Sequence, residues 1–154
     1  MHNSIQHLAW NVMNKEDLIK HLSGKVFVRL KPSIIVPGCV GVFAIRKIPA
    51  NTDPFGEDSI TSESFPVEEI RNHPQIPDSV KRYVEDMGVI SNGLLYIPGC
   101  GMNFIGVGYY VNHSESPNMK TDDGGERFLT LRVIEEGEEL TINYSTYNDE
   151  TGIR

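Results

Sequence analysis

Two stretches decide how this chain folds: residues 112–118, Asn-His-Ser-Glu-Ser-Pro-Asn, and residues 137–144, Gly-Glu-Glu-Leu-Thr-Ile-Asn-Tyr. The first is dense in side chains that both donate and accept hydrogen bonds, and its proline restricts the backbone. The second predicts a short strand whose alternation places Leu140, Ile142 and Tyr144 on one face, toward the core. A buried phenol needs a hydrogen-bond partner, so Tyr144 is either a satisfied core residue or part of a site.

Each stretch also has a purely structural interpretation when it is taken alone. Asn112, His113 and Ser114 are typical of a turn closed by side-chain hydrogen bonds, with a structural histidine. A serine–histidine hydrolase is not favoured, because the chain shows no nucleophile elbow and no acidic partner in a recognisable place.

The chain has 154 residues, which suits a single domain covering residues 1–154. Its composition, 39% hydrophobic and 23% charged, is typical of a soluble globular protein. No apolar run reaches the roughly 20 residues of a membrane span, and residues 1–10 do not resemble a secretory signal. We therefore expect an intracellular protein that does not bind a membrane.

Cysteine content and charge exclude further classes of protein. Cys39 and Cys100 are the only cysteines, and we expect free thiols rather than a disulfide or a zinc site. The net charge of −7 argues against direct nucleic-acid binding. Residues 1–50 carry seven lysines and arginines against two acidic residues, and the remainder carries seven against nineteen. The acidic part is either a solvated surface or a face that attracts a basic peptide.

The first half of the chain alternates helix, strand and turn signals. Asn14 is a good N-cap for a helix over residues 15–22, which Gly24 ends, so that residues 15–24 form an N-terminal helical segment. Alternation predicts strands over residues 25–30 and 39–44, and prolines and glycines predict a loop over residues 49–56.

Residues 65–99 read as a helical segment inserted between β elements. Asp78 can cap a helix over residues 79–87, whose apolar face comprises Val80, Tyr83, Val84 and Met87. Further strands are expected over residues 94–97, 106–111 and 127–133, the last with Leu129, Leu131 and Val133 on one face. The prediction is one mainly β domain with short helices, of the α+β type.

Taken together, the motifs resemble a known family. The glycine before Val42-Phe43-Ala44, the Asn112–Asn118 block and Glu-Leu-Thr-x-x-Tyr ending at Tyr144 occur in the order seen in SET-domain protein lysine methyltransferases. The resemblance covers residues 25–147. It implies a β-clip fold of several small sheets, in which the C-terminal strand threads beneath a loop in a knot-like arrangement.

The resemblance also implies a cofactor and roles for residues. SET domains bind S-adenosyl-L-methionine on one face, release S-adenosyl-L-homocysteine, and take a peptide on the other face; no metal takes part. By position, Cys39, Val40 and Gly41 together with Asn112 and His113 would contact the cofactor. Tyr144 matches the catalytic tyrosine. Glu138 and Glu139 are interpreted as structural.

Methyl transfer to an amine requires a neutral lysine, although the unperturbed pKa of lysine is about 10.4. An apolar, aromatic channel and a neighbouring sulfonium both disfavour the ammonium form, and alignment of the reacting atoms supplies much of the acceleration. Tyr109, Tyr110 and Tyr147 are candidates for the channel walls, although each is also a plausible packing residue.

The chain departs from the family pattern in three places. Cys39 stands where the first glycine of Gly-x-Gly is usual, and Glu115 where a cysteine is common. No cysteine cluster follows Tyr144, so the zinc-binding tail of many members is missing. The channel must then be closed by the last residues, by the segment 65–99, or by a second subunit, since some small members form dimers.

The sequence therefore favours a protein-lysine N-methyltransferase that depends on S-adenosylmethionine and acts on a basic protein, such as a histone. The alternative is a catalytically silent SET-like module that binds a basic peptide or protein; methylation of another acceptor is a third possibility. Such a small chain is typical of bacterial or viral members, which implies a cytoplasmic location, or a nuclear one if histones are the substrate.

Overall fold

The computed structural model describes residues 14–56, 62–125 and 127–149. The helices are α1 (Lys15–Gly24), α2 (Val67–Asn72) and α3 (Asp78–Met87), with 3-10 turns η1 (Met102–Phe104), η2 (Val107–Tyr110) and η3 (Tyr144–Thr146). The strands are β1 (Val28–Pro32), β2 (Val40–Ala44), β3 (Ser62–Pro66), β4 (Val89–Ser91), β5 (Leu94–Pro98), β6 (Asn112–His113), β7 (Met119–Thr121), β8 (Phe128–Thr130) and β9 (Glu139–Ile142).

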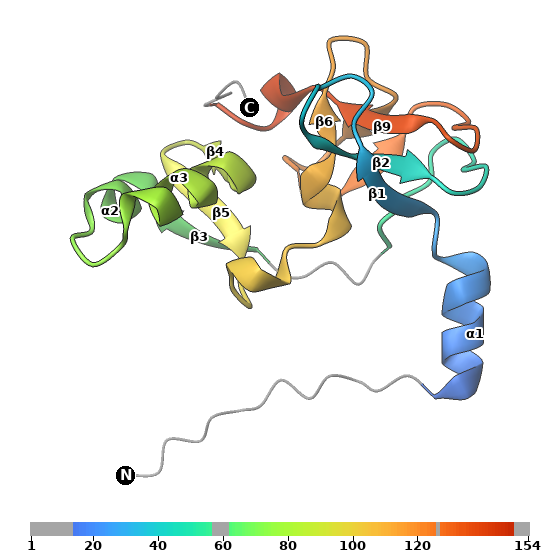
Figure 1. Cartoon of the computed structure of the whole chain (residues 1–154), viewed down its shortest axis with the longest axis horizontal. Helices are drawn as coiled ribbons and strands as arrows, with labels where there is room; N and C mark the ends of the chain where they lie inside the picture. Colours follow the sequence, from blue (N-terminus) through green and yellow to red (C-terminus); the bar gives the residue numbers. More distant parts are fainter. Residues whose placement is uncertain (1–13, 57–61, 126, 150–154) are drawn as a thin grey trace.

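The strands form three small sheets, with orders β1-β2-β9-β6, β3-β5-β4 and β7-β8. The C-terminal strand β9 lies between β2, with which it is antiparallel, and β6, with which it is parallel (Figure 1). Register pairs Val42 with Leu140 and Asn112 with Thr141. The two decisive stretches are therefore neighbours in one sheet, and the predicted fold class of small sheets with few short helices is confirmed.

The main core surrounds β9. Its buried members come from β2, β7, β9, η3 and the adjoining loops: Val42, Ala44, Ile48, Val111, Met119, Ile134, Leu140, Ile142 and Tyr144. Strand β9 is buried on both faces, because Glu139 and Thr141 are only 6% and 7% exposed. Burying these polar side chains is costly unless they are hydrogen-bonded, so their partners determine how the strand is held.

The segment 65–99 folds around a second, smaller core of Val67, Val84, Ile90 and Leu95. Figure 1 shows this unit, drawn in green and yellow, beside the body that carries β2 and β9. Helix α3 spans Asp78–Met87, close to the predicted residues 79–87. The prediction that Asp78 caps it is wrong, because the N-cap is Pro77 and no side chain makes a capping hydrogen bond. The predicted apolar face of the helix is only partly correct, because Val84 is buried whereas Val80 and Tyr83 are each 43% exposed.

Helix α1 forms where the sequence predicts it. The Asn14 side chain accepts a hydrogen bond from the Asp17 amide at 2.9 Å, as an N-cap does. The helix buries none of its residues, and Figure 1 shows it projecting from the body of the molecule. No helix of the described ranges is long and apolar enough to cross a membrane.

Two strand predictions are wrong. Residues 107–110 form the 3-10 turn η2 instead of a strand, closed by Tyr109 N–H donating to the Gly106 carbonyl and Val111 N–H to that of Gly108. Glycines at residues 106 and 108 weaken a strand and permit this tight turn.

The predicted strand 127–133 is shortened to Phe128–Thr130. The face assigned to its apolar residues is also wrong, because Leu131 is 50% exposed and Thr130 is 1% exposed. The Thr130 hydroxyl donates to the Pro49 carbonyl at 2.7 Å, and its oxygen accepts from the Thr52 amide at 3.0 Å. These bonds to the loop over 49–52 turn the polar side chain inward.

Candidate functional site

A cavity of about 600 Å³ lies between the inserted segment and the main body. The inserted segment contributes Met87, Val89, Ser91 and Tyr96 to its wall. The body contributes Phe55, Val107, Tyr109, Phe128, Tyr144 and Tyr147, together with Asp53, Asp123 and several glycines. Aromatic rings therefore form a large part of the wall, and two acidic residues border it.

Three of these rings form a connected wall. The Tyr144 and Tyr147 rings meet edge to face with centroids 6.1 Å apart, and Tyr147 meets Phe128 in the same way at 5.6 Å. Edge-to-face pairs stabilise one another and fix the ring orientations. On another part of the wall, burial raises the pKa of the Tyr109 phenol, while a hydrogen bond with Ser62 acts in the opposite direction.

Tyr144 occupies the junction between this cavity and the Asn112–Asn118 block. Its hydroxyl donates to the Val111 carbonyl at 2.7 Å, and its backbone N–H donates to His113 Nδ1 at 3.2 Å. The two rings lie with centroids 5.3 Å apart. The Val111 carbonyl thus holds the Tyr144 hydroxyl in a fixed direction at the cavity wall.

His113 has a defined tautomer in this arrangement. Since Nδ1 accepts from the Tyr144 amide, the ring proton lies on Nε2, which is 3.0 Å from the Glu115 carboxylate. The side chain is 37% exposed, so one edge of the ring is accessible from solvent.

The Asn112 side chain ties β6 to β2 across β9. Its amide nitrogen donates to the Val40 carbonyl at 3.0 Å and to Glu139 Oε1 at 2.9 Å, which uses both amide protons. The predicted cofactor residues Val40 and Asn112 are thus in direct contact. Gly41 lies beside them in β2, and Val40 itself is 43% exposed.

The Glu139 carboxylate lies at the centre of this region. The sequence predicts a structural role for Glu139 but not its contacts. Its Oε1 also accepts from the Ser33 hydroxyl at 2.7 Å, and its Oε2 accepts from the Ile34 amide at 2.8 Å. A side chain on Gly41 would overlap the Glu139 carboxylate, so the glycine makes room for it. The sequence signal that indicates such a role is a glutamate within the predicted strand that ends at Tyr144.

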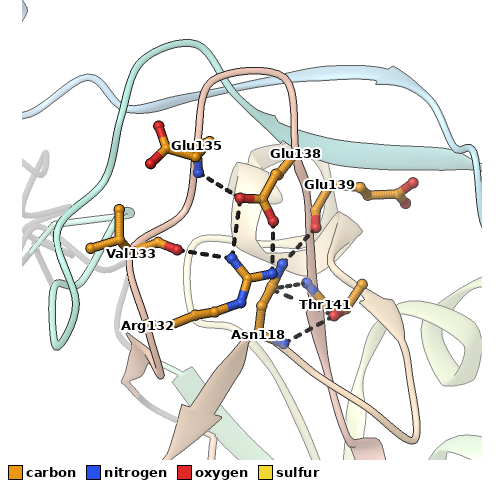
Figure 2. A network of polar contacts seen from close by, with 7 residues as sticks. All are labelled: Asn118, Arg132, Val133, Glu135, Glu138, Glu139 and Thr141. Atoms are coloured by element: carbon orange, nitrogen blue, oxygen red, sulfur yellow. Dashed lines mark hydrogen bonds and ion pairs between the residues drawn. The ribbon is translucent and has the colours of Figure 1, made fainter.

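Asn118, the last residue of the block, holds β9 in place, as Figure 2 shows. Its side-chain nitrogen donates to the Glu139 carbonyl, and its side-chain oxygen accepts from the Thr141 amide, both at 2.8 Å. In the same network, Arg132 bonds both carboxylate oxygens of Glu138, at 3.1 and 2.7 Å. The hydrogen bond from Arg132 lowers the pKa of Glu138.

Cys39 lies next to this region and carries an ordinary backbone. It is not among the non-glycine residues with positive φ, so the position does not require a glycine for conformational reasons. Cys39 and Cys100 are both free thiols, as the sequence predicts.

The structure therefore separates the predicted site residues into two groups. Cys39, Val40, Gly41, Asn112 and His113 lie together in one region, called here the β2–β6 face, in which Gly41 and Asn112 are buried, and none of the five lines the cavity. Tyr144, Tyr109 and Tyr147 line the cavity, whereas Tyr110 packs against the main core instead of forming its wall. Within the described residues no group of three or more His, Cys, Asp or Glu side chains could hold a metal.

Comparisons with known proteins bear on the family and the fold. The family model named SET domain matches residues 39–145, which is well over half of the chain. No curated protein sequence matches the chain.

Among solved structures, the chain resembles the Chaetomium thermophilum Polycomb Repressive Complex 2, in a humanised mutant bound to the inhibitor GSK126. The identity is 18%, the coverage is 87% of this chain and 17% of that chain, and the TM-score is 0.53. It also resembles ctPRC2 in an autoinhibited conformation bound to S-adenosylmethionine, with 19% identity, 88% and 17% coverage and a TM-score of 0.53. A Plasmodium falciparum protein described as a candidate histone methyltransferase is 18% identical, with 77% and 93% coverage and a TM-score of 0.45.

Such low identities show the fold alone, and the chain spans less than a fifth of the two Polycomb chains. The sequence match carries the assignment: the chain belongs to the SET-domain family.

Proposed function

We propose that this protein transfers a methyl group from S-adenosylmethionine to a lysine side chain of a protein. The observation that carries the proposal is the position of Tyr144, which lines the aromatic cavity and contacts His113 of the β2–β6 face. One side chain therefore touches both the predicted lysine side and the predicted cofactor side of the site.

The cavity suits a lysine side chain. Its aromatic walls favour the aliphatic stem of lysine and disfavour the charged form of the amine, which lowers the cost of reaching the nucleophilic state. Asp53 and Asp123 also line the cavity, but their carboxylates are engaged: Asp53 Oδ2 lies 3.8 Å from Arg127 Nε, and Asp123 Oδ1 accepts from the Arg127 amide. The acidic balance of residues 51–154 supports a basic protein as substrate.

Within the cavity, Tyr144 would orient the amine. The hydrogen bond from its hydroxyl to the Val111 carbonyl fixes the phenol oxygen at the cavity wall, against which the incoming amine would be aligned. The backbone bond from Tyr144 to His113 fixes the ring relative to the β2–β6 face. Positioning of this kind supplies a large part of the acceleration in a displacement reaction.

The β2–β6 face would hold the cofactor, which supplies an electrophilic methyl group when bound. The residues present fit such a ligand: an exposed apolar side chain at Val40, a partly exposed imidazole at His113 and the Glu115 carboxylate beside it, which suits a cationic group. Glu139 would act indirectly, because it holds the Asn112 amide and the backbone at Ile34.

Kinetics of peptide methylation by the Tyr144→Phe variant test this proposal. We expect kcat to fall about a hundredfold, which is the usual effect of removing one positioned polar group at a reacting centre. Tyr83→Phe is the matched control, because Tyr83 is exposed on α3 and does not line the cavity. Undiminished kcat in Tyr144→Phe would remove Tyr144 from the reaction.

The second candidate function is a silent module that binds a basic peptide. This candidate rests on the sequence departure at Cys39, where the family has a glycine, although the backbone at residue 39 has no positive φ and so does not itself disfavour the cofactor. Calorimetric titration with S-adenosylmethionine distinguishes the two functions. Absence of binding at millimolar cofactor would favour the silent module, whereas saturable binding would favour the enzyme.

A further inference from the structure

The residues that follow the second decisive stretch join the two halves of the molecule. Asn148 N–H donates to the Tyr144 carbonyl at 2.9 Å, which places Asn148 and Asp149 directly beyond η3. From there both residues reach β4 of the inserted segment, whose backbone lies about sixty positions earlier in the chain.

Three hydrogen bonds make this connection. Ile90 N–H donates to Asn148 Oδ1 at 3.2 Å, and Asp149 N–H donates to the Ile90 carbonyl at 2.8 Å. Asn92 N–H donates to Asp149 Oδ2 at 2.6 Å. Strand β4 is an edge of its sheet, paired with β5 on its other side, so Asn148 and Asp149 occupy the open edge. We call this contact the β4 clasp.

The β4 clasp is attached at Ile90 and Asn92, which lie next to residues of the cavity wall. Ile90 sends its side chain into the core of the inserted segment, while its neighbours Val89 and Ser91 line the cavity. On the opposite side of the contact, Tyr144 and Tyr147 precede Asn148 and line the same cavity. The clasp therefore couples two facing walls through a few bonds.

Such a coupling is needed because the two walls belong to different hydrophobic cores. Apolar packing fixes each core internally, but the distance between the cores depends on contacts that cross from one to the other. Another crossing contact is the hydrogen bond between Tyr109 and Ser62. The β4 clasp lies at the end of the cavity that carries Tyr144.

We infer that Asn148 and Asp149 are positioning residues for the lysine cavity, acting through β4. They hold the wall formed by Val89 and Ser91 at a set distance from the wall formed by the two tyrosines. This distance determines the width of the cavity and therefore the affinity for the lysine side chain. This inference rests on the proposed function for its substrate, whereas the clasp itself is a property of the fold.

The test uses single and double variants of the full chain. Asn148→Ala and Asp149→Ala each remove one acceptor, whereas Asn148→Asp and Asp149→Asn each retain an acceptor oxygen. Asp86→Ala on α3 is the control, because Asp86 is exposed and does not line the cavity. Amide hydrogen exchange at Ile90 and Asn92 reports on the clasp, and steady-state kinetics report on the cavity.

We expect faster exchange at both amides in the double alanine variant. The KM for a lysine peptide should rise roughly three- to tenfold, in line with the loss of one or two ordinary hydrogen bonds. We expect kcat and the affinity for S-adenosylmethionine to change less than about twofold, because the clasp does not reach the β2–β6 face. The acceptor-retaining variants and Asp86→Ala should behave as the parent chain does.

If amide hydrogen exchange at Ile90 and Asn92 is unchanged in the double alanine variant, the two side chains do not hold β4 and the inference is overturned. Faster exchange with an unchanged KM, or with an equal loss of cofactor affinity, would overturn the positioning role. If the parent chain transfers no methyl group although the clasp amides respond, the proposed function fails and the lysine role fails with it, while the clasp stands.

Discussion

Replacing Gly41 with alanine should destabilise the protein through one specific side chain, Glu139. A Cβ at Gly41 would overlap Glu139 Oε1 and lie 2.7 Å from its Cδ and 3.2 Å from Phe43 Cε2. Gly41 does not have a positive φ, so alanine meets no conformational strain there. In an open position the same change stabilises a protein by about 0.4–1 kcal/mol, and the expected loss is therefore steric.

The size of the effect follows from the bonds that the carboxylate must give up. Glu139 accepts from Ser33, Ile34 and Asn112, and hydrogen bonds to a charged group contribute about 1.5–3 kcal/mol each. If the displaced carboxylate loses one or two of them, the free energy of unfolding falls by about 1.5–6 kcal/mol. For a chain of this length the middle of that range lowers Tm by about 10 °C.

Urea denaturation of a double-mutant cycle measures this effect. Gly41→Ala should be strongly destabilising in the parent chain and nearly neutral in a Glu139→Ala background, where no carboxylate is present to clash. Gly24→Ala is the control, because a Cβ at Gly24 meets nothing within 4 Å. An equal effect of Gly41→Ala in both backgrounds, or no effect in the parent chain, would refute the steric reasoning.

Three further predictions concern the same sheet. Asn118→Ala should lower the free energy of unfolding by about 2–4 kcal/mol in urea titrations, because two buried backbone groups of β9, one of them the Thr141 amide, lose their partners. Glu138→Gln should flatten the acid limb of the Tm profile. Since Arg132 lowers the pKa of Glu138 from its ordinary 4.5, the pair stabilises the fold above that pH and stops doing so as pH falls through the lowered pKa. A parent chain that loses no more stability in acid than the glutamine variant would contradict this. Cys39→Gly should change the calorimetric Kd for S-adenosylmethionine less than about threefold, because residue 39 has no positive φ; a gain of a hundredfold would show that the thiol obstructs the cofactor.

Local signals predicted the elements that depend on local chemistry. Asn14 caps α1, and Gly88 follows the last residue of α3, because capping and termination are decided within one turn of the chain. The six-residue helix α2 was missed, since its N-cap is Pro66, which makes no side-chain cap. Turn η2 was mistaken for a strand because apolar periodicity says little about a short segment that contains two glycines.

In the site, too, local sequence motifs predicted some residues, whereas contacts between distant residues were not predicted. The motifs identified Asn112, His113 and Tyr144, which lie in or next to the contacts that join β6 and β9. They did not reveal that Glu139 binds the backbone at Ile34, because that contact joins residues 105 positions apart. The exposure of one face of a strand also cannot be read from alternation when neighbours cover both faces, as they do for β9.

The central claim is that this SET domain methylates lysine, and mass spectrometry of proteins incubated with isotopically labelled S-adenosylmethionine tests it most directly. A lysate of the organism that encodes the chain supplies the substrates, and Tyr144→Phe and Tyr83→Phe provide the comparison. We predict labelled methyl groups on lysine with the parent chain and with Tyr83→Phe, and loss of the label with Tyr144→Phe. A parent chain that binds the cofactor yet labels no lysine, or a Tyr144→Phe variant that labels lysine as strongly as the parent, would contradict the claim.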